Sequence, residues 1–185
     1  MQELFLFPGV KIVSLAAYPQ AQEVAEDGTT FEENASKKAL GYAAQTGCLT
    51  IADDSGLSVD FLSGRPGIYS ARYAGPGKSD RENCRKVLEE MAACPAARRG
   101  AHFTAAVAVA EPGKLIALVS GACYGFIASE PKGSNGFGYD PIFYFPAFNA
   151  TFGEIDPAQK HRVSHRAEAL DKAKAVLEEY VKTKI

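Results

Sequence analysis

One stretch decides the fold and the chemistry of this sequence: Leu49-Thr50-Ile51-Ala52-Asp53-Asp54-Ser55-Gly56. Its first half is apolar and predicts a buried strand, whereas its second half holds two adjacent carboxylates, a hydroxyl and a glycine. Because an unpaired buried carboxylate is costly, we expect the acids at the C-terminal end of the strand, where ligands bind in open α/β sheets. Adjacent carboxylates suit Mg²⁺ bound with a substrate phosphate. A polar turn is the alternative, since Asp, Ser and Gly are common turn residues.

The totals indicate an ordinary globular protein. The 185 residues suffice for a sizeable core, and we expect a single domain over residues 1–185. Hydrophobic residues make up 46% and charged residues 23% of the chain, and no apolar run approaches membrane-spanning length. The formal net charge of −2 predicts no general attraction to nucleic acid or membrane, so locally placed cations must hold any anionic ligand.

The cysteines argue against a metal or disulfide framework. Cys48, Cys84, Cys94 and Cys123 have no C-x-x-C spacing, and no histidine cluster accompanies them. Zinc and structural disulfides are therefore not expected in a chain of this size. We expect buried, reduced thiols in a cytoplasmic protein.

Start and stop signals predict the helices. Residues 30–33 and 79–82 read as capping boxes, in which a hydroxyl is followed three positions later by a glutamate. Gly47 and Pro95 provide the stops. Asp156 with Pro157, and then Ser164, can begin two more helical segments. The expected helices cover residues 31–46, 80–93 and 165–182, with a short turn at 157.

Alternating or β-branched runs predict the strands, and Met1–Phe7 reads as the end of a helix stopped by Pro8-Gly9. The two longest runs meet at Glu111-Pro112-Gly113, which predicts a hairpin. The expected strands cover residues 10–15, 49–56, 57–62, 102–110, 114–127 and 142–145. This order predicts an α/β fold of mixed α+β character, with a central twisted mixed sheet flanked by helices and a long antiparallel hairpin.

Acids and a lysine suggest a phosphate site with a metal. Glu23 and Glu26, in the loop before the first helix, could hold Mg²⁺ together with Asp53 and Asp54. Lys38 lies near a helix N-terminus, where the helix dipole also favours a phosphate. A solvated helix face is the alternative for Lys38.

Two later features suit a nucleobase. The loop Gly136-Phe137-Gly138-Tyr139-Asp140 offers a backbone that a ligand can approach closely and an aromatic face for stacking. Lys160, His165 and Arg166 gather before the last helix, although cations there oppose the dipole. The alternatives are a tight loop with a core aromatic residue and a charged helix start. Together with the acids, these features suit a nucleotide.

Three motifs resemble the inosine triphosphate pyrophosphatase family, in the order and spacing of that family, from about residue 10 to the end. The first motif is Thr30–Ala39. The second is Ala52–Leu57, continued by Gly64–Tyr73. The third is Gly136–Pro141, with Lys160 and Ser164–Arg166.

The resemblance implies an inosine triphosphate pyrophosphatase-like fold and a defined reaction. Members hydrolyse ITP, dITP and XTP between the α and β phosphates, giving the monophosphate and pyrophosphate, and so remove deaminated purines from the nucleotide pool. The resemblance also implies Mg²⁺ as the cofactor and a cytoplasmic homodimer, with a purine nucleoside triphosphate as its ligand.

The resemblance also assigns roles to residues. Asp54 would be the general base or a metal carboxylate, and Glu26 the second metal carboxylate, with Glu23 and Asp27 as alternatives in the same loop. Ser55 would contact the substrate, and Lys38 and Lys160 would meet phosphates. The residues enclosing and reading the base would be Phe137, Gly138, Tyr139, Asp140, His165 and Arg166.

The sequence departs from the family at its start. The family opens with a strand and a Thr-x-Asn-x-x-Lys loop that grips the triphosphate, and this sequence has neither, so we expect an N-terminally truncated domain with an unpaired sheet edge. Two further hypotheses remain beside the pyrophosphatase. One is a nucleotide-binding remnant without turnover, and the other is a related pyrophosphatase that prefers other modified bases.

Overall fold

The computed structural model describes residues 10–77 and 79–184, which form four α-helices, five strands and several short 3-10 helices. The helices are α1 (Phe31–Thr46), α2 (Asp80–Glu90), α3 (Pro157–Val163) and α4 (His165–Lys184). The strands are β1 (Thr50–Val59), β2 (Gly100–Glu111), β3 (Lys114–Ile127), β4 (Phe143–Phe145) and β5 (Ala150–Thr151). None of the helices in this part of the chain is long and apolar enough to cross a membrane.

The five strands form one sheet in the order β1-β2-β3-β4-β5. Strand β3 pairs with β4, and β4 with β5, both in the antiparallel direction. Pro112 and Gly113 join β2 to β3, and Gly113 has a φ of 79°, a conformation that glycine adopts at no steric cost. The α/β class and the long hairpin are confirmed. Of the two pairing directions expected, these strand pairs adopt the antiparallel one.

The chain divides into two compact units. The first unit comprises residues up to 54, 106–120 and those from 169 onwards, and the second comprises 55–105 and 121–168. Strand β1 therefore contributes residues to both units: its residues up to Asp54 belong to the first, and those from Ser55 belong to the second.

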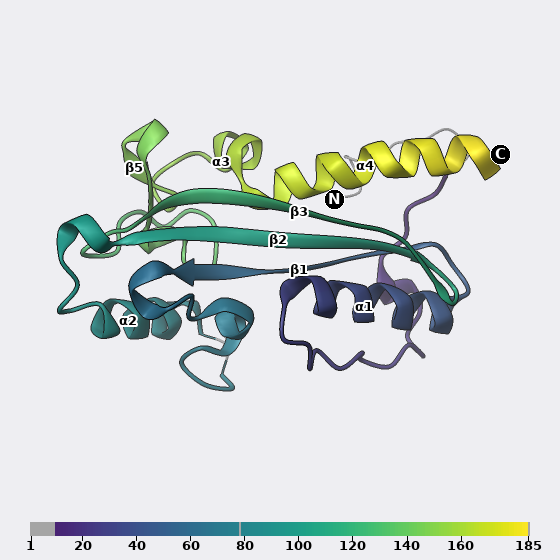
Figure 1. The fold of residues 1–185 in the computed structure, drawn as a ribbon, viewed down its shortest axis with the longest axis horizontal. Helices are drawn as coiled ribbons and strands as arrows, with labels where there is room; N and C mark the ends of the chain where they lie inside the picture. Colours follow the sequence, from purple (N-terminus) through teal and green to yellow (C-terminus); the bar gives the residue numbers. More distant parts are fainter. Residues whose placement is uncertain (1–9, 78, 185) are drawn as a thin grey trace. The chain divides into compact units, whose positions relative to one another are not determined.

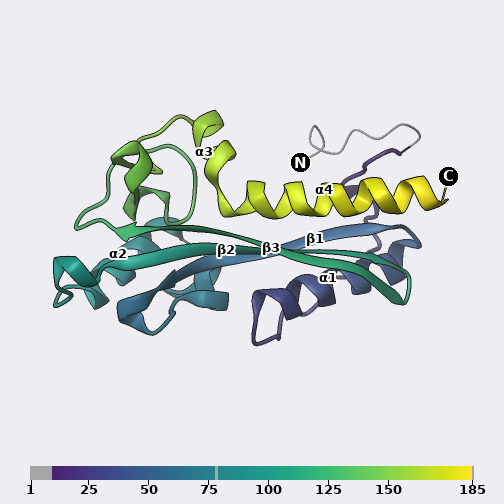
Figure 2. The same cartoon turned by 45° about the horizontal axis from the view of Figure 1, so that its top comes forward.

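In the first unit the strands lie between α1 and α4 (Figures 1 and 2). Ala35, Ala39 and Ala43 are fully buried, and their spacing of four residues places them on one face of α1. The segment of β2 in this unit is also made of small, fully buried residues, Ala106–Ala110. Small side chains on both elements allow the helix to pack close to the strands.

The second unit holds an aromatic core. The ring centroids of Phe103 and Phe143 are 4.6 Å apart, and those of Phe143 and Phe152 are 5.0 Å apart. Apolar side chains from β1, α2 and the residue that follows it, β3, and the segment before β4 complete the core. The fully or almost fully buried ones are Leu57, Val59, Val87, Met91, Ile127 and Ile142.

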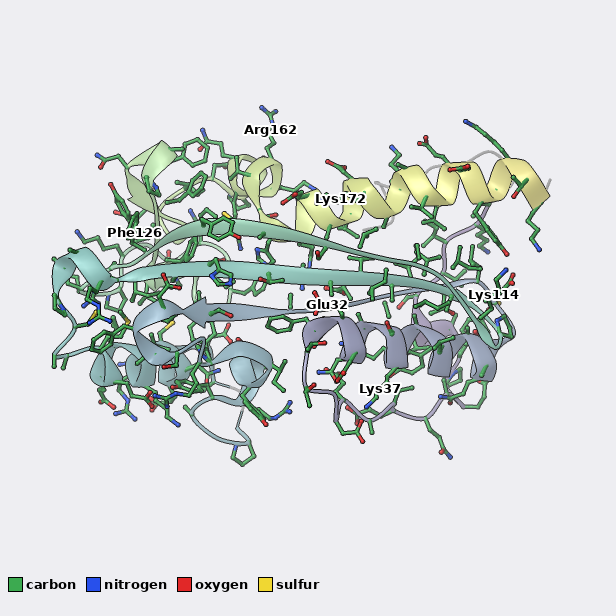
Figure 3. All side chains as sticks on the ribbon, viewed as in Figure 1. Glu32, Lys37, Lys114, Phe126, Arg162 and Lys172 are labelled. Atoms are coloured by element: carbon green, nitrogen blue, oxygen red, sulfur yellow. The ribbon has the colours of Figure 1, made fainter. Side chains whose placement is uncertain are left out.

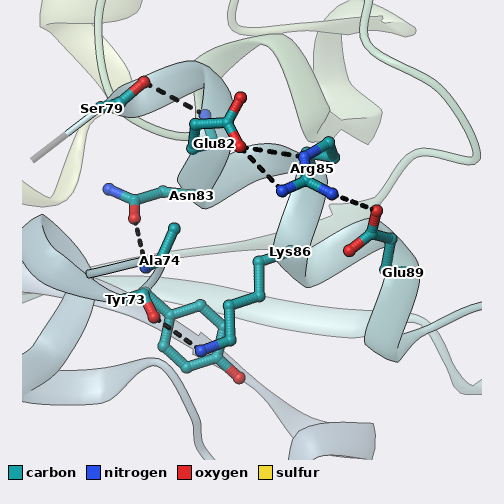
Figure 4. Close-up of polar contacts among 8 residues, drawn as sticks. All are labelled: Tyr73, Ala74, Ser79, Glu82, Asn83, Arg85, Lys86 and Glu89. Atoms are coloured by element: carbon teal, nitrogen blue, oxygen red, sulfur yellow. Dashed lines mark hydrogen bonds and ion pairs between the residues drawn. The ribbon is translucent and has the colours of Figure 1, made fainter. Parts of the chain in front are cut away.

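The predicted helix starts are confirmed. Thr30 Oγ1 accepts a hydrogen bond from the Glu33 N–H at 3.1 Å, and Glu33 in turn accepts from the N–H of Thr29. Ser79 Oγ likewise accepts from the Glu82 N–H (Figure 4). Helix α1 ends at Thr46 before Gly47, as predicted, whereas α2 ends at Glu90, three residues before the predicted end.

Asp156 Oδ1 caps α3 by accepting from the Ala158 N–H at 2.8 Å. Ser164 Oγ accepts from the Ala167 N–H at 3.2 Å and so caps α4. Both predicted caps are confirmed.

The strand predicted at residues 10–15 is wrong. Residues 10–14 have no regular secondary structure, and Leu15–Ala17 form the 3-10 helix η2, capped by Ser14. Among the described residues, β1 is an edge strand of the sheet, and residues 10–14 do not pair with it or with any other strand. An extended segment without a hydrogen-bonded neighbour is not a strand. The helix predicted at Met1–Phe7 lies outside the described residues.

The predicted end of the acidic strand is also wrong. Strand β1 runs through Asp53 and Asp54 to Val59, so the two acids lie in the middle of the strand rather than at its C-terminal end. The two strands predicted at 49–56 and 57–62 are therefore one, followed by the 3-10 helix η3 (Asp60–Leu62). A further 3-10 helix, η4, is formed by Gly67–Arg72.

The four cysteines are free. Cys84, Cys94 and Cys123 are buried, as expected, but Cys48 is exposed just after α1, so the expectation of burial is wrong for this residue.

Candidate active site

The first unit brings together Glu26, Asn34, Lys38 and Asp54, here called the acid–lysine cluster. Lys38 Nζ lies 3.2 Å from Asp54 Oδ1 and 3.3 Å from Glu26 Oε2. The side chains of Lys38 and Asp54 are each 14% exposed, so this ion pair is largely removed from water. Lys38 therefore links an acid of the loop before α1 to an acid of β1, and the solvated helix face considered for it is not what the structure shows.

Asn34 belongs to this cluster and was missed by the sequence analysis. Its Nδ2 donates to Asp54 Oδ2 at 3.1 Å, and its Oδ1 accepts from the Gly28 N–H at 2.8 Å. Asn34 and Lys38 are four residues apart, which places them on the same face of α1. The signal in the sequence that could have revealed it is an asparagine one helical turn before Lys38.

The environment of Asp54 suits a proton acceptor. Burial raises the pKa of the Asp54 carboxyl, and the charge of Glu26 adds to this, while Lys38 and Asn34 act in the opposite direction. A carboxylate whose pKa is raised is a stronger base than one in water. Lys38 and Asn34 keep its two oxygens in place.

The three acids of the loop differ in their positions. Glu26 contacts Lys38, whereas Asp27 pairs with Lys37 Nζ at 2.6 Å on the exposed side of α1. Figure 3 shows Lys37 on the side of α1 that faces away from the strands. Glu23 is exposed. Of these three acids, Glu26 lies near Asp54, because both residues pair with Lys38.

The acid–lysine cluster fits a Mg²⁺ ion that arrives with a substrate. Mg²⁺ is usually bound by one or two carboxylates together with substrate phosphates and water. Glu26 and Asp54 supply two carboxylates around Lys38 Nζ. Among residues 10–77 and 79–184 no three His, Cys, Asp or Glu side chains are grouped to hold a metal by themselves.

A cavity of about 670 Å³ in the first unit lies beside β1, the edge strand of the described sheet. Lys38 and Asp53 contribute to its lining, so the cavity reaches the lysine of the acid–lysine cluster. The other lining residues are mostly apolar and include Val10, Ile12, Ile51, Leu177 and Val181.

The second unit brings together Phe137, Asp140, Lys160, His165 and Arg166, here called the aromatic–cation cluster. Lys160 Nζ lies 2.5 Å from Asp140 Oδ2 and 4.4 Å from the centre of the Phe137 ring. The guanidinium carbon of Arg166 lies 5.6 Å from the same ring centre. Phe137 is 59% exposed, so its ring is available to a ligand, and it is not the core residue considered as the alternative.

Asp140 holds the glycine-rich loop in place. Its Oδ2 accepts from the Phe137 N–H at 2.8 Å, and Gly136 has a φ of 77°. A Cβ atom on Gly136 would lie 1.9 Å from Asp140 Oδ2, so this position requires glycine. Burial raises the pKa of the Asp140 carboxyl, while the hydrogen bond and charge of Lys160 lower it.

Tyr139 lies in the core. Its side chain is 4% exposed, and its hydroxyl donates to the Ser70 carbonyl at 2.8 Å. Any contact between Tyr139 and a ligand is therefore left to its backbone.

Ser55 and Arg166 are linked directly. Arg166 Nη2 donates to Ser55 Oγ at 3.1 Å. This hydrogen bond joins a serine on β1 to the first turn of α4.

His165 is a buried, neutral member of the cluster. It is 6% exposed, and its ring stacks on Phe103 at a centroid distance of 4.8 Å. Burial lowers its pKa to about 3, and the charges of Arg166 and Lys160 add to this. Its Nδ1 has no hydrogen-bond partner among the described residues. A neutral imidazole can accept or donate one hydrogen bond at that atom.

The folded chain is expected to lose stability as the pH falls from 6.5 towards 3. Unfolded His165 takes up a proton near pH 6.5, whereas folded His165 does so only near 3, so the unfolded state binds more protons within this window. The full loss is roughly 5 kcal/mol, and somewhat more than half of it falls between pH 7 and pH 4.5. Urea unfolding at pH 7 and at pH 4.5 measures the free energy of unfolding at both values. His165→Phe removes the group that titrates, so the difference between the two values should become smaller. His161→Phe, at an exposed position on α3, should leave this difference in the free energy of unfolding unchanged. The same difference in the wild type and both variants would contradict the prediction.

Comparison with known proteins decides the family. The family model described as the Ham1 family matches residues 1–176. The chain belongs to the Ham1 family. Two relatives are named dITP/XTP pyrophosphatase. The protein of Shouchella clausii is 50% identical over 167 residues, which cover 90% of this chain and 84% of that protein. That of Geobacillus kaustophilus is 48% identical over 178 residues, covering 96% and 87%.

Solved structures of Ham1 proteins have the same fold. The HAM1 protein from Coxiella burnetii superposes with a TM-score of 0.90 at 41% identity, covering 96% of this chain and 91% of that one. The Staphylococcus aureus Ham1 protein gives a TM-score of 0.87 at 40% identity, covering 94% and 90%. The resemblance to the inosine triphosphate pyrophosphatases is thereby confirmed at the level of the family, and the Ham1 fold is that of this chain.

Proposed function

We propose that this Ham1 protein hydrolyses ITP, dITP and XTP to the nucleoside monophosphate and pyrophosphate with the help of Mg²⁺. The chain is a nucleoside triphosphate pyrophosphatase, in keeping with the dITP/XTP pyrophosphatases to which it is similar. The observation that carries the proposal is the acid–lysine cluster, in which Lys38 lies between the carboxylates of Glu26 and Asp54.

Asp54 is the proposed general base. A water molecule attacks the α phosphorus, Asp54 takes a proton from that water, and the bond from the α phosphorus to the α,β-bridging oxygen breaks to release pyrophosphate. The raised pKa of Asp54, caused chiefly by burial, suits this role. Asn34 holds the second carboxylate oxygen, and Lys38 supplies positive charge for the phosphates.

Glu26 and Asp54 are the residues that would hold Mg²⁺. When bound, the ion neutralises the negative charge that develops on the leaving pyrophosphate. The proposal therefore predicts that a chelator such as EDTA abolishes turnover and that added Mg²⁺ restores it.

The aromatic–cation cluster is the proposed reader of the base. Phe137 provides a stacking face, and Gly138 and Tyr139 follow it in the same loop. Hypoxanthine and xanthine carry an oxygen at position 6, which accepts a hydrogen bond, whereas adenine carries an amine there. A donor such as Arg166 pairs with the oxygen but faces another donor in ATP, and an unpaired buried donor disfavours the wrong base.

Arg166→Met is expected to reduce the preference for ITP over ATP. Losing a hydrogen bond from a charged donor should lower kcat/KM for ITP by roughly 10- to 100-fold, while the low activity with ATP changes little. Pyrophosphate release with the two substrates measures the ratio. The matched control is Arg162→Met, which replaces an exposed arginine of α3 (Figure 3). An unchanged ratio in the Arg166 variant would remove this residue from base selection.

The test of the function is pyrophosphate release by this chain with ITP and XTP against ATP and GTP, in the presence of Mg²⁺. Release from ITP and XTP alone is the expected result. Binding of ITP without release would favour the nucleotide-binding remnant instead. Release from modified pyrimidine triphosphates and none from ITP would favour the related pyrophosphatase with other substrates.

The proposal includes a cytoplasmic homodimer, as the resemblance to the family implies. The formal net charge of −2 gives no reason to expect nucleic acid or a membrane as a partner. Sedimentation analysis of the purified chain distinguishes the dimer from a monomer.

A further inference from the structure

Two side chains of α2 hold one residue of the glycine-rich loop. Asp80 Oδ2 accepts a hydrogen bond from the Gly138 N–H at 2.6 Å, and Cys84 Sγ donates to the Gly138 carbonyl at 3.3 Å. Asp80 and Cys84 are four residues apart, so both lie on the same face of α2. We propose that Asp80 is a positioning residue, which acts through Gly138 to hold Phe137 where the base stacks. The inference rests on the proposed function.

The loop needs an anchor on this side of Phe137. Asp140 already holds the N–H of Phe137 itself. The following residue, Gly138, has a φ of 59°, and nothing lies within 4 Å of the position that its Cβ would occupy. Side-chain packing therefore does not fix Gly138 at this position. Its N–H and carbonyl are held by the hydrogen bonds to Asp80 and Cys84.

Helix α2 is a firm support for this contact. Asn83, which is 2% exposed, accepts from the Ala74 N–H at 2.7 Å and donates to the Ala71 carbonyl. Lys86 Nζ donates to the Tyr73 carbonyl at 2.7 Å. Figure 4 shows these side chains reaching from α2 to residues 73 and 74. A loop held by α2 is therefore held to the body of the second unit.

The chemistry of the two contacts fits a positioning role. A carboxylate that accepts from a backbone N–H forms a charge-assisted bond, which is stronger and more directional than a neutral one. Burial raises the pKa of the Cys84 thiol to about 12, so its S–H proton stays in place. The Asp80–Gly138 contact is exposed, so its loss should affect the loop more than global stability.

The experiment compares Asp80→Ala, Asp80→Asn and Glu82→Ala in pyrophosphate release from ITP. Without an acceptor for Gly138, the Ala variant should raise KM for ITP about tenfold and change kcat less than threefold. Asparagine keeps an acceptor oxygen and should restore most of the KM. Glu82 pairs with Arg85 on the exposed side of α2, so its replacement should have no effect.

A second readout separates positioning from general damage. Inorganic tripolyphosphate has no base, so its inhibition constant should be the same in the wild type and Asp80→Ala. An unchanged KM for ITP would overturn the inference, and so would equal weakening of ITP and tripolyphosphate. Asp80→Ser, whose side chain is too short to reach Gly138, provides the same comparison if the Ala variant does not fold. A wild-type chain that releases no pyrophosphate would instead refute the proposed function, and the inference with it.

Discussion

Replacing Asp54 with asparagine is expected to lower pyrophosphate release from ITP by about a thousandfold, the size typical of losing a general base. Asparagine keeps the shape of the side chain but can neither take a proton from water nor carry the charge that Lys38 and a metal need. Initial rates with saturating Mg²⁺ measure the effect.

The same replacement should not destabilise the chain. Burial raises the pKa of Asp54, which means that the folded environment disfavours its charge, so a neutral side chain should leave the thermal midpoint unchanged or raise it. Asp171→Asn, at an exposed position on α4, is the control for both measurements. A variant at position 54 that kept near wild-type turnover would remove Asp54 from the proposed mechanism.

Lys160→Met is expected to lower the free energy of unfolding by about 3 kcal/mol, because it leaves the carboxylate of Asp140 buried without its cation. The side chains of Asp140 and Lys160 are only 2% and 12% exposed, so water cannot replace the lost partner. The variant should also raise KM for ITP, since Lys160 lies over the Phe137 ring. Urea unfolding and steady-state kinetics measure the two effects.

A double replacement tests this explanation. Adding Asp140→Asn removes the unpaired charge but keeps an acceptor for the Phe137 N–H, so most of the stability should return while KM stays high. Lys132→Met is the matched control, because Lys132 and Glu130 form an exposed pair that contributes little to stability. If the double variant were no more stable than Lys160→Met, the loss would come from packing rather than from an unpaired carboxylate.

Local signals in the sequence predicted much of the fold. The caps at Thr30, Ser79 and Asp156 and the turn at Gly113 depend on residues within a few positions of one another. Such interactions can be read from the chain directly. The family resemblance rests on similarly local motifs, and the comparisons confirm it.

Contacts between distant residues explain the predictions that failed. Residues 10–14 alternate like a strand, but a strand also needs a partner, and their own sequence does not contain that information. The acids of β1 were expected at the C-terminal end of the strand. Lys38 and Asn34 of α1 pair with Asp54, which allows this acid to lie in the middle of the strand.

His165 shows the same limit in the aromatic–cation cluster. A charged helix start was the alternative considered for His165 and its neighbour Arg166. Stacking on Phe103, far away in the sequence, makes it a buried neutral ring instead. The sequence indicated His165 as a candidate site residue, but its protonation state depends on the folded core.

The short connection between β2 and β3 has a consequence for how the chain folds. Pro112 and Gly113 alone separate the two longest strands, so closing this loop costs little entropy. Hairpins of this kind form within microseconds, well before segments that are distant in sequence can meet. We therefore expect the hairpin to form first, with β1 and the helices assembling on it later. Changes at Gly113 should act mainly on the folding rate, whereas changes in the acid–lysine cluster, which assembles later, should act mainly on the unfolding rate.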